Sequence, residues 1–251
     1  MRFQKKHVLI TGGPGNIGLP TAKAFLAEGA RVFLIDNNEQ RLDEAVRELG
    51  FTNVATAVAD VRKASDVVRY AEEAVKTFGK IDIFFNNAGI EGPVKPLTEF
   101  PDDGFDLVMD INVRGVYLGC KYVAPHMNDG GSITITSSVA GLRGSPNLVA
   151  YTTSKWAVIG IMKSAAIDLA SRGIRCNTVH PGMVDSEMLK RIEVAADGTN
   201  VGATREALIA RTPLGRYIAP SEISDMVLFL ASDAARAITG SQFVVDGGFM
   251  A

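Results

Sequence analysis

Short apolar runs rich in β-branched residues alternate along the chain with longer amphipathic stretches. Uniformly apolar runs of this length are typical of strands that are buried on both faces of a parallel sheet. Seven runs are predicted strands: His7–Thr11, Arg31–Ile35, Val54–Val58, Ile81–Phe85, Ser132–Thr136, Ile174–Val179 and Gln242–Val245. Helical periodicity predicts helices at Asn16–Gly29, Asn38–Leu49, Lys63–Phe78, Phe105–His126, Tyr151–Ser171 and Pro220–Ala231. The alternation predicts an α/β fold with right-handed crossovers.

One region breaks this rhythm. Residues 186–215 are polar, contain glycine and have only weak periodicity. Such a segment is either a plain surface excursion or a mobile lid over a site, and we predict a substrate lid. No repeat, low-complexity tract or linker divides the chain, so we expect one dinucleotide-binding and catalytic domain over residues 1–251.

Composition narrows the class of protein. The hydrophobic content of 47% is ample for a large core, and the net charge of −2 with mixed signs argues against nucleic acid as a partner. Cys120 and Cys176 lie in apolar contexts, and we expect both to be reduced core residues. The three histidines are scattered, so no metal site is expected. The N-terminal apolar segment is too short to cross a membrane, and we expect a cytoplasmic protein.

A glycine-rich string separates the first strand from the first helix. It reads Thr11-Gly12-Gly13-Pro14-Gly15-Asn16-Ile17-Gly18 and satisfies Gly-x-Gly-x-x-Gly. Glycines at such a position let the backbone turn sharply and approach a pyrophosphate, which the N-terminus of the next helix then stabilises. The alternative is a glycine-rich turn without a ligand. The strand before it and the helix after it favour dinucleotide binding.

Acidic residues after the second and third strands point to the rest of that dinucleotide. Asp36 ends the second strand, and a carboxylate there accepts hydrogen bonds from the ribose hydroxyls and repels a 2′-phosphate. We therefore predict NAD, with NADP less favoured, although Arg41 lies one helical turn further on. Asp60 is expected either to accept a bond from adenine or to cap the helix that starts near Lys63.

The candidate chemistry lies in Tyr151-Thr152-Thr153-Ser154-Lys155, with Ser138 upstream. On a helix, Lys155 lies one turn beyond Tyr151 on the same face. A nearby ammonium favours phenolate, so we expect the pKa of Tyr151 to fall below its usual value near 10. A tuned phenol exchanges protons with an alcohol or carbonyl oxygen, and a serine hydroxyl holds that oxygen. The alternative is a packed tyrosine beside a solvated lysine.

Taken together, these residues resemble the short-chain dehydrogenase/reductase family, classical type. The resemblance covers essentially the whole chain and also rests on the following motifs: Asn86-Asn87-Ala88-Gly89, Asn112, Pro181-Gly182 and Val245-Asp246-Gly247-Gly248. It implies a single Rossmann-type doubly wound sheet of about seven strands in the order 3-2-1-4-5-6-7. It also implies a catalytic tetrad of Asn112, Ser138, Tyr151 and Lys155, in which Asn112 binds a relay water. Ser138, not Ser137, has the family's spacing to the tyrosine.

The glycine loop departs from the classical pattern at one position. Asn16 stands where the middle glycine is usual, and the spacing of Gly12, Gly15 and Gly18 resembles the loop of the extended branch. Asparagine is the residue besides glycine that best tolerates a positive φ, so we expect the turn to persist with Asn16 in it.

The resemblance implies contacts for both ligands. The cofactor residues are Gly12, Gly15, Asn16, Ile17, Gly18, Asp36, Asn37, Asp60, Val61, Asn87, Ala88, Gly89, Tyr151, Lys155, Pro181, Gly182, Val184 and Ser186. The substrate residues are Ser138, Val139, Arg143, Asn147, Tyr151, Met183 and Met188. Other readings stay open: Asn87-Ala88-Gly89 also suits a plain turn, Arg143 and Glu91 also suit a solvated surface, and His180 suits packing at a strand end.

The expected activity is reversible hydride transfer between NAD and a secondary alcohol or ketone. The mostly apolar substrate residues favour a hydrophobic, cyclic or aryl small molecule. Two alternatives remain: a 3-oxoacyl thioester reductase that uses NADPH, and a nucleotide-binding sensor without activity. The resemblance further implies a homotetramer, built through the two long helices and through the C-terminal strand with Phe249-Met250-Ala251.

Overall fold

A single parallel sheet forms the centre of the molecule, in a computed structural model that describes residues 1–196 and 201–251. Its seven strands run in the order β3-β2-β1-β4-β5-β6-β7, and every neighbouring pair is parallel. The strands are β1 (His7–Thr11), β2 (Arg31–Asp36), β3 (Val54–Val58), β4 (Ile81–Asn86), β5 (Met127–Thr136), β6 (Arg175–Pro181) and β7 (Gln242–Val245). The predicted strand order is confirmed. The order reverses between β1 and β4, which is where ligands bind in such sheets.

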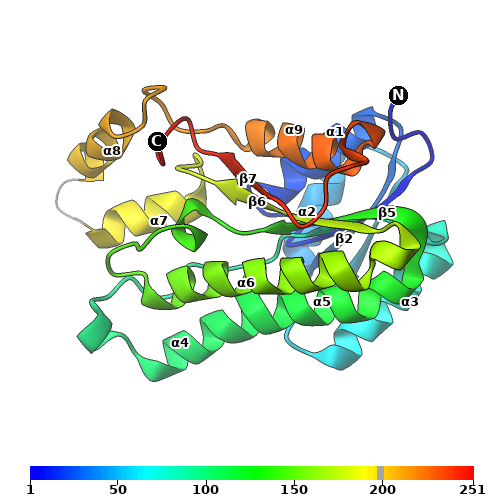
Figure 1. The fold of residues 1–251 in the computed structure, drawn as a ribbon, viewed down its shortest axis with the longest axis horizontal. Helices are drawn as coiled ribbons and strands as arrows, with labels where there is room; N and C mark the ends of the chain where they lie inside the picture. The colour runs from blue at the N-terminus through cyan, green and yellow to red at the C-terminus, as the bar shows by residue number, and fades with distance from the viewer. Residues whose placement is uncertain (197–200) are drawn as a thin grey trace.

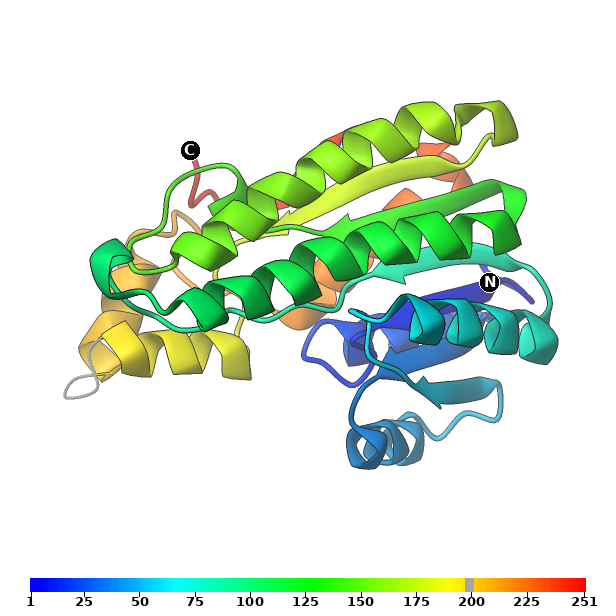
Figure 2. The same cartoon turned by 90° about the horizontal axis from the view of Figure 1, so that it is seen from below.

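Helices cover both faces of this sheet (Figure 1). They are α1 (Gly18–Ala27), α2 (Glu39–Leu49), α3 (Ala64–Phe78), α4 (Asp102–Met109), α5 (Gly115–Val123), α6 (Val149–Asp168), α7 (Glu187–Ala196), α8 (Val201–Ala210) and α9 (Pro220–Ala231). α1, α2 and α9 pack on one face, and α3, α5 and α6 pack on the other, which is turned toward the viewer in Figure 2. Two cores result, one on each side of strands whose side chains alternate between them.

Adjacent strand residues show this division of the core. Phe84 on β4 packs with Tyr70 of α3 on one face, while its neighbour Phe85 packs with Phe25 of α1 on the other. All four side chains are fully buried. Because both faces are covered, the central strands carry apolar residues at consecutive positions, and this is the pattern that made them recognisable in the sequence.

Of the predicted helices, only Pro220–Ala231 has the expected bounds, and two of the differences bear on the site. The helix expected from Asn16 begins at Gly18, because the glycine turn extends to Ile17. The helix expected over Phe105–His126 is observed as α4 and α5 with a π-helical turn, Asp110–Arg114, between them. A wide turn of this kind often occurs at a functional position, and this one contains Asn112.

The segment predicted as a lid, residues 186–215, contains α7 and α8. Both helices lie beyond the carboxyl ends of β6 and β7 (Figure 1). Residues 197–200 of the predicted lid lie outside the described residues. In the described part of the chain, no helix has the length and apolar character that crossing a membrane would require.

Candidate active site

A cleft of about 1040 Å³ opens at the carboxyl ends of the strands. Its walls come from the segments that follow β1 to β6, since the C-termini of parallel strands meet at one edge of the sheet. Every residue predicted to bind cofactor or substrate lines it except Gly18, and every predicted catalytic residue lines it except Asn112. Residues that are distant in sequence therefore share one cavity.

The turn after β1 has the close backbone approaches that only glycine allows. Gly12 has a φ of +64°, and a Cβ on Gly18 would lie 2.3 Å from the Gly12 carbonyl oxygen. A Cβ on Gly15 would meet only that same oxygen, at 3.0 Å, so the turn is open toward the cleft. This cradle fits a pyrophosphate. The turn persists with Asn16 in it, as expected, but Asn16 does not adopt a positive φ, because among the described non-glycine residues only Lys5 and Asn147 do.

Two threonines that the sequence analysis missed hold the loop after β4 against this turn. The Thr11 hydroxyl oxygen accepts hydrogen bonds from the backbone N–H of Asn87 at 2.9 Å and of Ala88 at 3.1 Å. The Thr136 hydroxyl donates to Asn87 Oδ1 at 2.9 Å. Asn87 and Ala88 are thus fixed between β1 and β5. A threonine at the end of a buried strand gives no sequence signal for such a contact.

The end of β2 places an acid and a base side by side. Asp36 lines the cleft, and its Oδ1 accepts a bond from the Asn38 backbone N–H at 3.0 Å. Arg41 lines it too, and its guanidinium donates to the Pro14 carbonyl oxygen at 3.1 Å. Arg41 therefore reaches the glycine turn. The carboxylate suits a ribose with free hydroxyls, whereas the guanidinium suits a phosphate.

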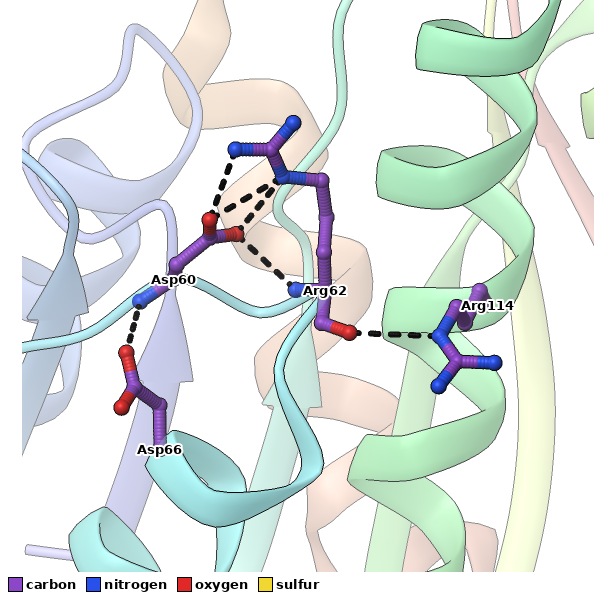
Figure 3. Close-up of polar contacts among 4 residues, drawn as sticks. All are labelled: Asp60, Arg62, Asp66 and Arg114. Atoms are coloured by element: carbon purple, nitrogen blue, oxygen red, sulfur yellow. Dashed lines mark hydrogen bonds and ion pairs between the residues drawn. The ribbon is translucent and has the colours of Figure 1, made fainter.

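A second acid at this end is paired with an arginine (Figure 3). Arg62 donates to both carboxylate oxygens of Asp60, at 2.7 to 3.1 Å, and holds the pKa of that carboxyl below its usual range. Asp60 does not cap α3. Asp66 instead accepts a bond from the Asp60 backbone N–H at 2.9 Å, and Arg114 donates to the Arg62 carbonyl oxygen at 3.2 Å. These contacts anchor the loop after β3.

Asn112 is fully buried and bonded to another segment, not to its own helix. Its Oδ1 accepts from the Ile90 backbone N–H at 2.9 Å, and its Nδ2 donates to the Ile90 carbonyl oxygen at 2.8 Å. Nδ2 also donates to the Ser154 hydroxyl at 3.0 Å. Both amide donors are thereby used, so Asn112 fixes the loop after β4 relative to α6. Ser154 was missed because a serine on a helix is usually solvated.

The two adjacent serines after β5 have different surroundings. Ser138 lines the cleft, and its Oγ accepts a bond from the Ala140 backbone N–H at 3.1 Å. The Ser137 hydroxyl donates to the Lys155 carbonyl oxygen at 2.8 Å. His180 Nδ1 lies 3.0 Å from the Ser138 carbonyl oxygen, and its Nε2 lies 2.8 Å from the Thr178 hydroxyl. His180 therefore helps to position Ser138, which is more than the packing role expected for it.

Tyr151 and Lys155 lie together on α6 with shifted pKa values. Burial raises the pKa of Tyr151 to about 12, although a hydrogen bond with Ser138 acts in the lowering direction. Burial lowers the pKa of Lys155 to about 8. The Lys155 Nζ donates to the Thr136 carbonyl oxygen at 2.9 Å and lies 5.5 Å from the centre of the tyrosine ring. The direction for Tyr151 is opposite to the one expected, because burial disfavours the phenolate.

The segment after β6 packs against the C-terminal turn. A Cβ on Gly182 would lie 2.6 Å from the Asp246 Cβ, so only glycine fits there. Pro181 and Val184 line the cleft. The Ser186 hydroxyl donates to the Val184 carbonyl oxygen at 3.1 Å and accepts from the Leu189 N–H at 3.2 Å. Both bonds of the Ser186 hydroxyl are therefore made at the start of α7, and the sequence did not predict this local role.

An ion pair that sequence analysis missed joins the substrate side of the cleft to α7. Glu91, in the loop after β4, is buried and accepts from Arg191 Nε at 2.5 Å. Its negative charge also acts to raise the pKa of Tyr151. Because the two residues are separated by 100 positions, no local pattern in the sequence indicates that they meet.

Comparisons with known proteins agree with this geometry. A family model described as "Enoyl-(Acyl carrier protein) reductase" matches residues 14–250. The chain is 37% identical to levodione reductase of Leifsonia aquatica, covering 98% of this chain and 95% of that one. It is 36% identical to the 3-oxoacyl-[acyl-carrier-protein] reductase FabG of Thermotoga maritima, with both chains fully covered. It is 35% identical to cyclohexanol dehydrogenase of Acinetobacter sp. strain SE19, covering 99% and 96%. The crystal structure of NAD+-bound xylitol dehydrogenase matches with a TM-score of 0.93 and 36% identity, over 99% of this chain and 100% of that one.

Proposed function

This chain belongs to the short-chain dehydrogenase/reductase family of oxidoreductases, and from that premise we propose that it interconverts a secondary alcohol and its ketone with NAD. One observation carries the proposal: Ser138, Tyr151 and Lys155 share a cleft with the glycine turn and Asp36. A proton-transfer group, an oxygen-binding hydroxyl and a dinucleotide cradle are the parts that this reaction needs.

When bound, the nicotinamide supplies the hydride acceptor or donor. The chain's own residues handle the oxygen and its proton. Tyr151, with a pKa of about 12, is protonated at neutral pH and so is ready to donate its proton to a ketone oxygen. Ser138 orients that oxygen and stabilises its developing negative charge. Lys155 would hold the nicotinamide ribose. Asn112 holds the loop after β4 in place through its bonds to the backbone of Ile90. In alcohol oxidation Tyr151 must first lose its proton.

NAD is the proposed cofactor because Asp36 stands where a ribose hydroxyl would bind. A carboxylate there repels a 2′-phosphate. The similarity to the crystal structure of NAD+-bound xylitol dehydrogenase supports the same choice. Arg41 favours the alternative, a thioester reductase that uses NADPH, since its guanidinium reaches the glycine turn, and the similarity to FabG agrees with that alternative.

The proposed substrate has an apolar body next to its hydroxyl. Val139, Met183, Met188 and Leu189 form apolar parts of the wall on the side of Tyr151 and Ser138. Cyclohexanol dehydrogenase, one of the relatives, is named for a cyclic secondary alcohol. We therefore favour cyclic and aryl secondary alcohols over thioesters.

The test follows reduced-nicotinamide absorbance with NAD or NADP and with cyclic, aryl and aliphatic secondary alcohols. Tyr151→Phe should lose turnover and still bind the cofactor, whereas Tyr117→Phe, at an exposed tyrosine of α5, should keep the normal rate. Near-normal turnover in Tyr151→Phe would refute its role as acid and base. Turnover with NADP alone would refute the argument from Asp36.

We also propose a homotetramer. Tyr117 on α5, Trp156 and Ile167 on α6, and Val244 on β7 are large apolar side chains left exposed. Apolar groups concentrated on packed elements are more stable when a partner subunit covers them. Their positions on the long helices and on the last strand match the two contacts expected for this family.

A further inference from the structure

Two arginines flank one aromatic ring at the substrate side of the cleft. The guanidinium carbon of Arg143 lies 5.0 Å from the centre of the Phe249 ring, and that of Arg211 also lies 5.0 Å from it. All three residues line the same cavity as Tyr151 and Ser138. Arg143 follows Ser138 by only five positions, on the loop that starts at the predicted oxygen-binding site. Two cations therefore meet at one aromatic ring in the wall of the cavity that also holds the reacting groups.

The C-terminal turn fixes Phe249 in this place. The buried carboxylate of Asp246 accepts from the backbone N–H of Gly248 and of Met250, both at 2.9 Å. Gly247 and Gly248 both have a positive φ, and a Cβ on Gly248 would lie 2.9 Å from Pro213. The turn is thus specified by its own residues. Since Phe249 is held, the arginines that stack on it are held as well.

Neither arginine has an acidic partner among the described residues. The other arginines of this side do: Arg191 pairs with Glu91, Arg205 with Asp185, and Arg216 with Glu222. The acids that line this side are also engaged, because Glu187 pairs with Lys190 and Glu193 accepts from the Tyr217 hydroxyl. Within residues 1–196 and 201–251, no carboxylate therefore pairs with the two cations at Phe249.

We propose that Arg143 and Arg211 form a subsite for a carboxylate on the substrate, resting on the alcohol–ketone chemistry proposed above. A guanidinium that lies over an aromatic face keeps its N–H donors for a partner in its own plane. A carboxylate accepts two such bonds and relieves the repulsion between the two cations. The substrate class becomes a hydroxy or oxo acid whose apolar body separates the reacting carbon from the carboxylate.

A phosphate of the cofactor does not explain this pair. The pyrophosphate is expected at the glycine turn before α1, where Arg41 is the guanidinium that reaches the backbone. Arg143 and Arg211 instead come from the loop after β5 and from the segment after α8. An anionic group that binds both arginines therefore belongs to the substrate and not to the cofactor.

The experiment compares two ketones that differ only in charge: a cyclohexanone that bears a ring carboxylate, and its methyl ester. Their Kd values are measured by calorimetry with NADH in a Tyr151→Phe background, and their kcat/KM values with the unaltered tyrosine. Arg143→Gln, Arg211→Gln and the double variant remove the charges, and the double lysine variant keeps them. Arg236→Gln removes one cation from the opposite end of the sheet, where Arg236 contacts only the Asp233 carbonyl oxygen.

We expect the carboxylate to bind better than the ester and the double glutamine variant to weaken its binding about tenfold, which is the factor for about 1.4 kcal/mol of lost charge-assisted bonding. Arg211 is exposed, so its single variant should have the smaller effect. Binding of the ester should not change, and the lysine variant should retain part of the preference for the carboxylate.

Equal binding of the two ketones by the unaltered subsite would overturn the proposal, and so would an equal loss for both ketones in the variants. If neither ketone is reduced with either cofactor while the carboxylate still binds through the arginines, the proposed reaction fails and the subsite stands. If neutral cyclic ketones are reduced and charge has no influence, the reaction stands and the subsite fails.

Discussion

Replacing Lys155 with methionine should make the stability of the folded chain less dependent on pH. Lys155 is buried, and burial lowers its pKa from 10.5 to about 8. A base with a lowered pKa holds fewer protons in the folded chain than in the unfolded chain between those two values. Stability therefore rises with pH over this window, because the unfolded chain binds more protons there.

The magnitude follows from the two values. Below about pH 8 the whole penalty for burying the ammonium is present, and above about pH 10.5 it is gone. The gap between 10.5 and about 8 corresponds to about 3 kcal/mol, most of which is recovered between about pH 7 and about pH 10. The window ends there because Tyr151, with its pKa raised to about 12, lowers stability above about pH 10.

The assay is urea unfolding of the wild type and Lys155→Met at several pH values in this window. The free energy of unfolding of the variant minus that of the wild type should fall by about 2 to 3 kcal/mol from about pH 7 to about pH 10. Loss of the bond to the Thr136 carbonyl oxygen shifts this difference equally at every pH. Lys163→Met is the control, since Lys163 is an exposed lysine of the same helix that also donates to a backbone carbonyl oxygen, that of Gly240. A constant difference for Lys155→Met would refute the reasoning.

Three further predictions test the turn, the ion pair and the exposed surface. Gly18→Ala puts a Cβ 2.3 Å from the Gly12 carbonyl oxygen, so it should destabilise the chain by about 2 kcal/mol and weaken NADH binding. Gly202→Ala is the control, since Gly202 has open space around it, and it should leave NADH binding unchanged. Urea unfolding measures the stability of each variant, and NADH fluorescence measures its cofactor binding. Glu91→Gln removes a charge that raises the pKa of Tyr151, so the pH–rate profile of alcohol oxidation should move to lower pH, and an unmoved profile contradicts this. Ile167→Glu places a charge at an apolar side chain that is 77% exposed and should reduce the mass seen by light scattering; an unchanged oligomer would exclude this face as a contact.

The strands were predictable because their signal is local. β1, β3 and β7 have the predicted bounds, and the others differ at their ends. Strands covered on both faces need apolar residues at every position, and few other structures give that pattern. The π-helical turn at Asn112 was not predictable from periodicity, because it accompanies bonds from Asn112 to Ile90, which lies in another segment of the chain.

The candidate site was predictable as a set of positions and less so as a set of contacts. The glycine turn, Asp36 and the tetrad are recognised by residue type and spacing. The ion pair of Glu91 with Arg191 and the arginines around Phe249 depend on how distant segments pack. Side-chain direction at the end of a strand or in a loop has no local signature. The contacts that set the charge around the cleft therefore could not be predicted from local sequence patterns.

The direction of the Tyr151 pKa shows the same limit in physical terms. Helical spacing correctly places Lys155 beside Tyr151, and from proximity alone an ammonium should lower the pKa of a phenol. Lys155 is buried and Tyr151 is half-buried in the folded chain, and desolvation disfavours the charged form of each. At neutral pH the lysine is still cationic and the tyrosine is still protonated, which is the state that donates a proton to a ketone. Reduction should therefore be the faster direction at neutral pH, and oxidation should gain as the pH rises, because a phenolate then forms at the pair.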